Sequence, residues 1–286
     1  LYAQRIGLQG NQVWSDPTAV MSNNSLQIGA YPDFVGDGNG GGMFTWYGVN
    51  PLQSYASHVL ADGSHGYGGE VQIASSSSGT VRVNPVGIRD ENELIVFFRP
   101  QESNQSSDGV AAQRLASDGS LLWGSAGITL KPISGSPQYG SFAAAKTKQG
   151  VTLFFTNAPS FGNDVIDGVS LNQNGEAQWS PEFVSVASTP SVKSRIAISS
   201  TGDGILLAWQ DDRNGSNDIY AQRVNSDGSL GTAMLCVADI DGDGFVGVTD
   251  LLMVIDMWGN CPVKGSCDAV MDGDNLVGVS ELLAII

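Results

Sequence analysis

A repeat of about 53–56 residues runs through most of this chain of 286 residues. Its best-preserved segment, Leu1-Tyr-Ala-Gln-Arg-Ile6, returns almost unchanged as Ile219-Tyr-Ala-Gln-Arg-Val224. Weaker copies of this anchor lie at Tyr55–Val59, Ala111–Leu115 and Asp167–Leu171. A fixed period of this length indicates one supersecondary unit used several times, with neighbouring units burying a shared core.

A second marker follows each anchor: a glycine, three residues, and then a large side chain. The pairs are Gly10 and Trp14, Gly63 and Tyr67, Gly119 and Trp123, and Gly175 and Trp179, whereas Gly228 leads only to Thr232. Exposed aromatic rings at these places could form a sugar-stacking row. Because one ring recurs at the same place in each unit, we expect these rings to pack between neighbouring units instead.

Each unit has the pattern of short strands. Tyr2, Gln4 and Ile6 alternate with Ala3 and Arg5, which is the period of a half-buried strand. Turns such as Ser117-Asp-Gly-Ser120 suit hairpins, because glycine accepts a positive φ. More apolar strands, expected to be buried on both faces, follow at Gly42–Trp46, Leu94–Phe98, Val151–Phe155 and Ile205–Trp209. A mostly β fold of β-propeller-like repeats is therefore predicted.

The expected propeller domain covers residues 1–235 and has about four blades plus a partial one. Its units lie near 1–53, 54–109, 110–165 and 166–218, with a partial unit at 219–235. A ring closed by its own termini would not repeat the anchor strand at both ends. We therefore expect a segment of a longer, truncated propeller, the alternative being a four-bladed ring with an additional hairpin.

One stretch of the repeat region resembles a bacterial repeat family. In that family a Trp-x-Asp-x-Arg-x-Gly turn precedes Asp-Ile-Tyr-Ala-Gln-Arg, and the equivalent here is Trp209–Arg223. The resemblance implies a propeller-like fold in secreted or surface proteins. It implies no particular activity.

The segment Asp239–Asp250 has the spacing of an EF-hand-type calcium loop. Acidic residues stand at loop positions 1, 3, 5 and 12, and Gly244 stands at position 6, where such a loop turns sharply. The side-chain ligands would be Asp239, Asp241, Asp243 and Asp250. Position 7 contributes its backbone carbonyl, here from Phe245. We expect Ca²⁺ as the bound ion.

A second copy of this loop follows 31 residues later. It keeps acidic residues at Asp272, Asp274 and Glu281, and Leu276 takes the place of Phe245. Val270 replaces the first aspartate, so this copy lacks one carboxylate and is expected to bind Ca²⁺ more weakly.

The doubled loop-and-helix unit at residues 236–286 resembles a type I dockerin, with Trp258-Gly-Asn-Cys-Pro262 between its repeats. The resemblance implies that each loop binds Ca²⁺ and that the paired helices dock onto a cohesin-like or cell-envelope protein. In that family the partner is recognised at loop positions 10 and 11, which here are Val248, Thr249, Val279 and Ser280. The second helix is expected to be incomplete.

The residues behind the first loop have the pattern of an amphipathic helix. Its apolar stripe consists of Leu251, Leu252, Val254, Ile255 and Trp258. This stripe either packs on its twin from the second repeat or contacts a partner, and both can hold together.

Charge and composition limit the possible partners. The formal net charge is −16, and the last 51 residues carry half of it, with nine carboxylates and one lysine. Nucleic acid is disfavoured, because phosphate binding needs clusters of Lys and Arg. No apolar run reaches the roughly 20 residues that a membrane helix needs. The three cysteines, Cys236, Cys261 and Cys267, allow several pairings. We expect an extracellular or cell-surface bacterial protein.

Signs of catalysis are few. The two histidines, His58 and His65, adjoin no nucleophile motif, and Asp211, Asp212 and Asp218 resemble catalytic carboxylates only by residue type. We therefore expect a non-catalytic protein, whose propeller binds protein or glycan and whose calcium-binding tail attaches it to a protein partner. The alternative is a fragment of a carbohydrate-active enzyme, a polysaccharide hydrolase or lyase with a dockerin appendage.

Overall fold

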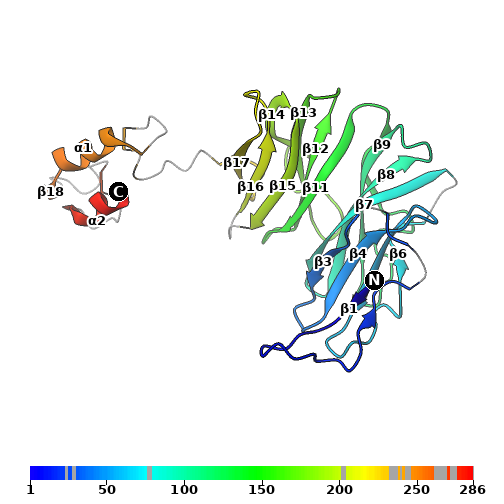
Figure 1. The fold of residues 1–286 in the computed structure, drawn as a ribbon. Coiled ribbons are helices and arrows are strands. Elements are labelled where there is room, and N and C mark those ends of the chain that lie inside the picture. The colour runs from blue at the N-terminus through cyan, green and yellow to red at the C-terminus, as the bar shows by residue number, and fades with distance from the viewer. Residues whose placement is uncertain are drawn as a thin grey trace. The chain divides into compact units, whose positions relative to one another are not determined.

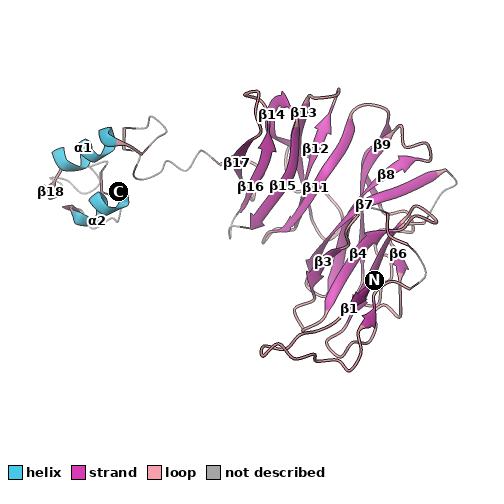
Figure 2. Ribbon diagram, in the orientation of Figure 1, coloured by secondary structure: helices cyan, strands magenta, loops and turns pink. Residues whose placement is uncertain are grey.

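The computed structural model describes residues 1–22, 25–27, 30–75, 79–200, 204–231, 238, 240–241, 246–260, 269–270 and 276–285. Contacts within the chain divide it into two compact units, Leu1–Leu230 and Gly231–Ile286. The first unit is built of strands, and the helices lie in the second (Figure 2).

Three complete four-stranded antiparallel sheets make up most of the first unit (Figure 1). The first comprises β3 (Asp33–Gly36), β4 (Gly42–Tyr47), β5 (Ser54–Val59) and β6 (Val71–Gln72). The second comprises β7 (Thr80–Asp90), β8 (Glu93–Glu102), β9 (Asp108–Leu115) and β10 (Ile128–Ser134). The third comprises β11 (Gln138–Lys146), β12 (Val151–Ala158), β13 (Asp164–Leu171) and β14 (Val184–Ser191). Each strand pairs with its neighbour in sequence, so each sheet is a meander.

Two smaller sheets flank these three in the sequence. Strands β1 (Tyr2–Ala3) and β2 (Thr18–Ala19) form one pair, and β15 (Lys193–Ser200), β16 (Gly204–Asp211) and β17 (Asp218–Asn225) form a three-stranded sheet. Successive meanders of this kind, each packed on the next, are the blades of a β-propeller. The predicted fold class is confirmed, with a small helical part near the C-terminus.

The repeated anchor is the third strand of each blade. It lies in β5, β9, β13 and β17, so each sequence repeat runs from the third strand of one blade to the second strand of the next. By the same alignment β1 and β2 correspond to the last two strands of a blade, and β15–β17 correspond to the first three. Three complete blades thus stand between two partial ones in the part of the chain that the structure describes.

The second strand of each complete blade is the predicted apolar strand, and its side chains alternate between two cores. In β8, Leu94, Val96 and Phe98 join the cluster shared with the preceding blade. Ile95 and Phe97, which point to the other face, join the cluster shared with the following blade. Because both faces of β8 are covered, its segment Leu94–Phe98 is apolar without interruption.

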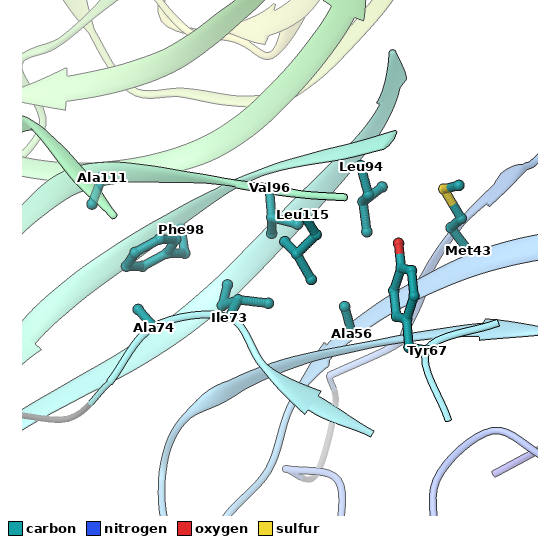
Figure 3. Close-up of a cluster of buried hydrophobic side chains, with 10 residues drawn as sticks. All are labelled: Met43, Ala56, Tyr67, Ile73, Ala74, Leu94, Val96, Phe98, Ala111 and Leu115. Atoms are coloured by element: carbon teal, nitrogen blue, oxygen red, sulfur yellow. The ribbon is translucent and has the colours of Figure 1, made fainter. Parts of the chain in front are cut away.

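The core between the first two complete blades shows how these faces meet (Figure 3). Met43, Ala56 and Tyr67 come from the first blade and its third-to-fourth-strand turn. They lie against Leu94 and Leu115 of the second blade, and all five side chains are buried. Apolar side chains of the two blades are therefore buried together in one shared core.

The second unit contains α1 (Val248–Asp256) and α2 (Val279–Ile285). Strands β18 (Gly259–Asn260) and β19 (Leu276–Val277) pair antiparallel to each other. A small core forms around Val254, Ala269 and Val277. Among the described residues, no helix has the length and apolar character needed to cross a membrane.

Candidate functional site

The predicted calcium ligands are only partly within the described residues. Asp241 and Asp250 of the first loop are described, as are Leu276 and Glu281 of the second. The other predicted ligands, Asp239, Asp243, Phe245, Asp272 and Asp274, lie outside the described residues. In the part that is described, no group of three or more His, Cys, Asp or Glu side chains gathers as a metal site.

The carboxylate of Asp250 is fully buried in the first turn of α1. Its Oδ2 accepts a hydrogen bond from the Gly247 N–H at 2.8 Å, and its Oδ1 accepts from the N–H groups of Ile240 at 2.7 Å and Asp241 at 3.2 Å. The Gly247 hydrogen bond lowers the pKa of Asp250, and this effect, with the two other N–H groups, outweighs the opposing effect of burial. The carboxylate is therefore held in its charged form, which a hard cation requires.

Glu281 repeats this arrangement in the second loop. It is fully buried, and its Oε2 accepts from the Gly278 N–H at 2.8 Å and from the Ser280 hydroxyl at 3.1 Å. The two carboxylates thus take the same place at the start of the two helices. Their chemistry fits a calcium ligand set, in which position 12 supplies a carboxylate.

The four residues expected to contact a partner lie on the surface at the starts of the two helices. Val248 is 72% exposed and Val279 is 60% exposed. One turn further on, Leu252 and Leu283 are 58% and 67% exposed. The two helices therefore present equivalent apolar pairs, Val248 with Leu252 and Val279 with Leu283.

The stripe predicted behind the first loop is covered only in part. Val254 is fully buried, whereas Leu252, Ile255 and Trp258 remain about half exposed. Trp258 also lies beyond the end of α1 at Asp256. The core around Val254 is too small to cover the whole stripe, so much of the stripe faces solvent.

The aromatic residues after the turn glycines pack between blades, as expected from their recurrence. The indole Nε1 groups of three of them donate to backbone carbonyls in the corresponding turn of the next blade. The pairs are Trp14 with Ala61 at 2.9 Å, Trp123 with Gln173 at 3.1 Å, and Trp179 with Ser226 at 2.9 Å. This use leaves these rings unsuited to a sugar-stacking row.

Asp211 lies at the centre of a buried polar cluster. Its carboxylate accepts from the Ser191 hydroxyl at 2.6 Å and the Trp209 indole at 3.0 Å, and it also pairs with Arg213. The Lys193 ammonium lies 3.4 Å away and is fully buried. Burial acts to raise the pKa of Asp211, but hydrogen bonds from Arg213, Ser191 and Trp209 outweigh it and hold the pKa well below its usual range. The charged carboxylate of Asp211 therefore stabilises the fold, and these hydrogen bonds and ion pairs occupy both of its oxygens.

The other residues weighed for catalysis also have structural roles or lie in isolation. Asp212 accepts the Val192 N–H at 2.8 Å, and Asp218 is exposed. The Nε2 of His58 lies 3.0 Å from Asp37 Oδ2, so this buried histidine secures the loop before β4. His65 is exposed in a turn.

Sequence reasoning missed a buried carboxylate at the start of β9. Asp108 accepts the Tyr139 N–H from the next blade at 3.1 Å and lies 3.7 Å from Arg99 Nη1. Burial raises the pKa of Asp108, although Arg99 and the Tyr139 N–H act in the opposite direction. Asp164, one repeat later, accepts the Lys193 N–H at 3.0 Å in the same way. Asp108 lies three residues before Ala111, and Asp164 lies three residues before Asp167, which are the first residues of the two anchor copies. This recurrence is the signal that could have identified both aspartates.

A pocket at the same end of the blades was also not foreseen. It measures about 400 Å³ and adjoins the ends of β11, β12 and β13. Phe161 is fully exposed beside it, and Ser136, Gln138 and Ser160 supply polar groups.

Comparison with known proteins yields structural similarity without sequence similarity. No protein-family model matches the chain, and no curated protein matches it. A puromycin hydrolase structure is similar with a TM-score of 0.51 and 13% identity, over 79% of this chain and 34% of that one. This chain thus spans about a third of that protein.

Two glycoside hydrolases are similar at lower scores. A thermostable family-43 glycoside hydrolase has a TM-score of 0.47 and 9% identity, with 74% of this chain and 75% of that chain covered. An α-L-arabinofuranosidase from Lactobacillus brevis has a TM-score of 0.44 and 11% identity, with 69% and 68% covered. At such identities a structural likeness concerns the fold alone.

Proposed function

We propose that this chain is part of an exported polysaccharide-directed protein. Its propeller blades bind a polysaccharide, and its C-terminal module attaches the protein to a partner in a calcium-dependent way. The observation that carries the first part is the pocket beside Phe161.

This pocket combines the two kinds of group that recognise sugars. The C–H face of a sugar ring is apolar and packs on an aromatic ring, whereas its edges carry hydroxyls that need hydrogen-bond partners. Phe161 supplies an exposed ring, and Ser136, Gln138 and Ser160 supply hydroxyl and amide groups. Among the described residues, those that line the pocket include the carboxylate of Asp164 and no lysine or arginine, so a neutral hydroxylated ligand suits the pocket better than a phosphate.

Affinity electrophoresis in gels containing soluble polysaccharides tests this part. At least one polysaccharide should retard the chain, and Phe161→Ala should abolish the retardation. Tyr31→Ala is the matched control, because Tyr31 is another highly exposed ring and lies away from this pocket. Equal retardation of the wild-type and Phe161→Ala chains would contradict the proposal.

The attachment role rests on the paired apolar residues of the C-terminal module. Val248 and Leu252 on α1 match Val279 and Leu283 on α2, and all four are more than half exposed. Exposed apolar patches of this kind are typical of protein interaction sites. Calcium would order the two acidic loops from which these helices start, so that metal binding and formation of the docking surface are coupled.

A panel of immobilised cohesin domains tests attachment. Binding should require Ca²⁺, disappear in EGTA, and weaken in a Leu252→Glu, Leu283→Glu double variant that still binds Ca²⁺. Replacement of Leu206, an exposed leucine in the propeller unit, by glutamate is the control. Absence of binding to every cohesin would redirect the search to envelope proteins, and Ca²⁺-independent binding would refute the mechanism.

Hydrolysis of the bound polysaccharide is the second candidate function. The observation that favours it is Asp108, since a raised pKa suits the general acid of a glycosidase. Against it, the carboxylate is fully buried and its Oδ1 already accepts a backbone N–H. Release of reducing sugar that is lost in Asp108→Asn would favour the enzyme over the binding protein. Phe34→Ala is the control, because Phe34 is an exposed ring on β3, in another blade, and its replacement should leave the release unchanged.

A further inference from the structure

A second pocket, which we call the Arg99 pocket, lies between the first two complete blades, at the end where β4 and β8 finish. It measures about 110 Å³ and is lined mostly by polar side chains, among them Tyr47, Arg99, Gln101 and Gln105. The described residues that line it include one cation, Arg99, and no carboxylate. The pocket beside Phe161 has the opposite character, because its charged residue is Asp164. The two pockets therefore suit different ligand groups.

Arg99 is held by a hydrogen bond yet remains partly exposed. Its Nη1 donates to the carbonyl oxygen of Tyr139 at 2.7 Å, and its side chain is 23% exposed. The carboxylate of Asp108 lies 3.7 Å from the same Nη1, but it is fully buried and does not line the pocket. Burial raises the pKa of Asp108, which weakens its competition with a ligand for the guanidinium. An arginine fork that is fixed in this way can bind a carboxylate through two parallel hydrogen bonds.

Gln101 brings an unsatisfied polar group to the pocket. Its side chain lines the pocket, and the residue is only 4% exposed. Among the described residues, none donates a hydrogen bond to its Oε1. A buried amide oxygen without a donor costs free energy, and a ligand hydroxyl would supply the donor. The pocket thus suits a ligand that carries hydroxyls as well as a carboxylate.

Gln105 has a backbone conformation that favours glycine. Its φ is +58°, and it lies in the turn between β8 and β9. The corresponding turns of the next two blades use Gly162, with a φ of +76°, and Gly215, with a φ of +86°. A side chain strains the backbone in this region, so the presence of glutamine here indicates a use for its amide.

The turn that carries Gln105 also lies next to the pocket beside Phe161. Gln138, which lines that pocket, donates from its Nε2 to the carbonyl oxygen of Ser106 at 3.2 Å. Gln105 and Ser106 are consecutive, so one short turn adjoins both pockets. Units of one polysaccharide chain can therefore occupy both.

We propose that the Arg99 pocket binds a uronic acid unit of the same polysaccharide whose neutral unit packs on Phe161. The ligand is then an acidic polysaccharide, with a carboxylate on Arg99 and hydroxyls on Gln101 and Gln105. This inference rests on the proposed function and narrows it, because a neutral polysaccharide would leave Arg99 without an anion.

Biolayer interferometry on immobilised polysaccharides tests the inference. Polygalacturonate, alginate and hyaluronate are each compared with their carboxyl-reduced forms, which keep the chain and lose the charge. The buffer contains about 0.15 M salt, so that a screening length of about 8 Å limits repulsion from the protein's net charge of −16. At least one uronate polymer should bind the protein more tightly than its reduced form does.

Two variants of the pocket should weaken this preference. Arg99→Lys keeps a cation beside Asp108 but loses the fork, and it should weaken binding of the uronate polymer about tenfold while leaving the reduced form unaffected. Gln105→Gly removes the amide and relieves the backbone strain, so it should remain folded and bind the uronate polymer several-fold more weakly. Arg5→Lys is the control, because Arg5 also donates to a backbone carbonyl, that of Ala61, and lines neither pocket.

The outcomes separate this inference from the proposed function. Equal affinity for each uronate polymer and its reduced form would overturn the inference and leave the pocket beside Phe161 as a neutral sugar site. Uronate binding that Phe161→Ala abolishes, but that Arg99→Lys and Gln105→Gly leave unchanged, would also overturn it. Uronate binding that is lost in Arg99→Lys and kept in Phe161→Ala would support the Arg99 pocket and refute the one beside Phe161. No binding to any polymer would refute both.

Discussion

The indole Nε1 of Trp179 donates a hydrogen bond to the carbonyl oxygen of Ser226, 2.9 Å away and 47 residues later. The same ring lies against Gly228, the glycine of that turn. The glycine of each such turn therefore has two roles. It closes a hairpin in its own blade, and it packs against the aromatic ring of the preceding blade. This double use explains why the glycine and the ring recur together at a constant spacing.

Substitution of Gly228 by alanine should measure the ring contact. A left-handed residue other than glycine costs about 1–2 kcal/mol from backbone strain alone. At Gly228 the new Cβ would also lie 2.7 Å from Trp179, and such overpacking adds about 1–3 kcal/mol. Gly10→Ala is the matched control, because Gly10 has a similar φ and no such neighbour among the described residues. Urea unfolding should show the larger loss for Gly228→Ala, and equal losses would contradict the contact.

Replacement of Trp179 separates its hydrogen bond from its packing. Trp179→Phe removes the indole N–H and should lower the free energy of unfolding by about 0.5–1.5 kcal/mol. Trp179→Ala also removes the buried ring and should lower it by about 3–5 kcal/mol. Trp258→Phe, at a half-exposed site in the other unit, should leave the unfolding of the propeller unit unchanged. A Phe variant as unstable as the Ala variant would show that the hydrogen bond, and not packing, dominates.

The sequence predicts the propeller because a period shows directly in the residues. It does not predict where a blade begins, because a repeat has a length but no marked starting strand. The anchor Ile219–Val224 is conspicuous as a sequence, yet it lies in β17, the third strand of its blade. Which strand of the blade carries the anchor becomes clear only from the pairing of the strands. In that sheet β15 lies at one edge and β17 at the other.

The polar clusters were predictable only in part, for a different reason. The turn Asp-Asp-Arg at Asp211 is visible in the sequence, but its carboxylate is fixed by Ser191, which lies 20 residues away. Asp108 shows no local motif at all, because its partner is the Tyr139 backbone of the next blade. Contacts between blades depend on how the blades pack, which a local pattern does not contain.

Acid should destabilise the propeller unit partly through Asp211. Its pKa in the folded protein lies below that of an unfolded aspartate, about 3.9. The unfolded state therefore binds more protons in acid, so the stabilisation is present above that value and is lost as the pH falls from about 5 toward the folded pKa. Urea unfolding measured between pH 7 and pH 3 should show a weaker pH dependence for Asp211→Asn.

The same Asp211→Asn variant should also be less stable at neutral pH. Lys193 would lose its buried partner, a change that costs about 3–5 kcal/mol. Trp179→Ala, similarly destabilised but without loss of a titrating group, should keep the wild-type pH dependence. An unchanged slope in Asp211→Asn would mean that other groups govern the acid transition.

Calcium titration by calorimetry should detect saturable binding to the intact chain, with an affinity in the range of about 10⁻⁷ to 10⁻³ M. Asp250→Asn removes a charged oxygen from position 12 while its amide keeps one carbonyl for the Gly247 N–H, so binding to the first loop should be lost without collapse of α1. Asp256→Asn is the control, because it removes an equal charge from an exposed position of the same helix. If Asp250→Asn binds Ca²⁺ as the wild type and Asp256→Asn do, Asp250 is not a calcium ligand, and the buried carboxylate only holds the start of α1.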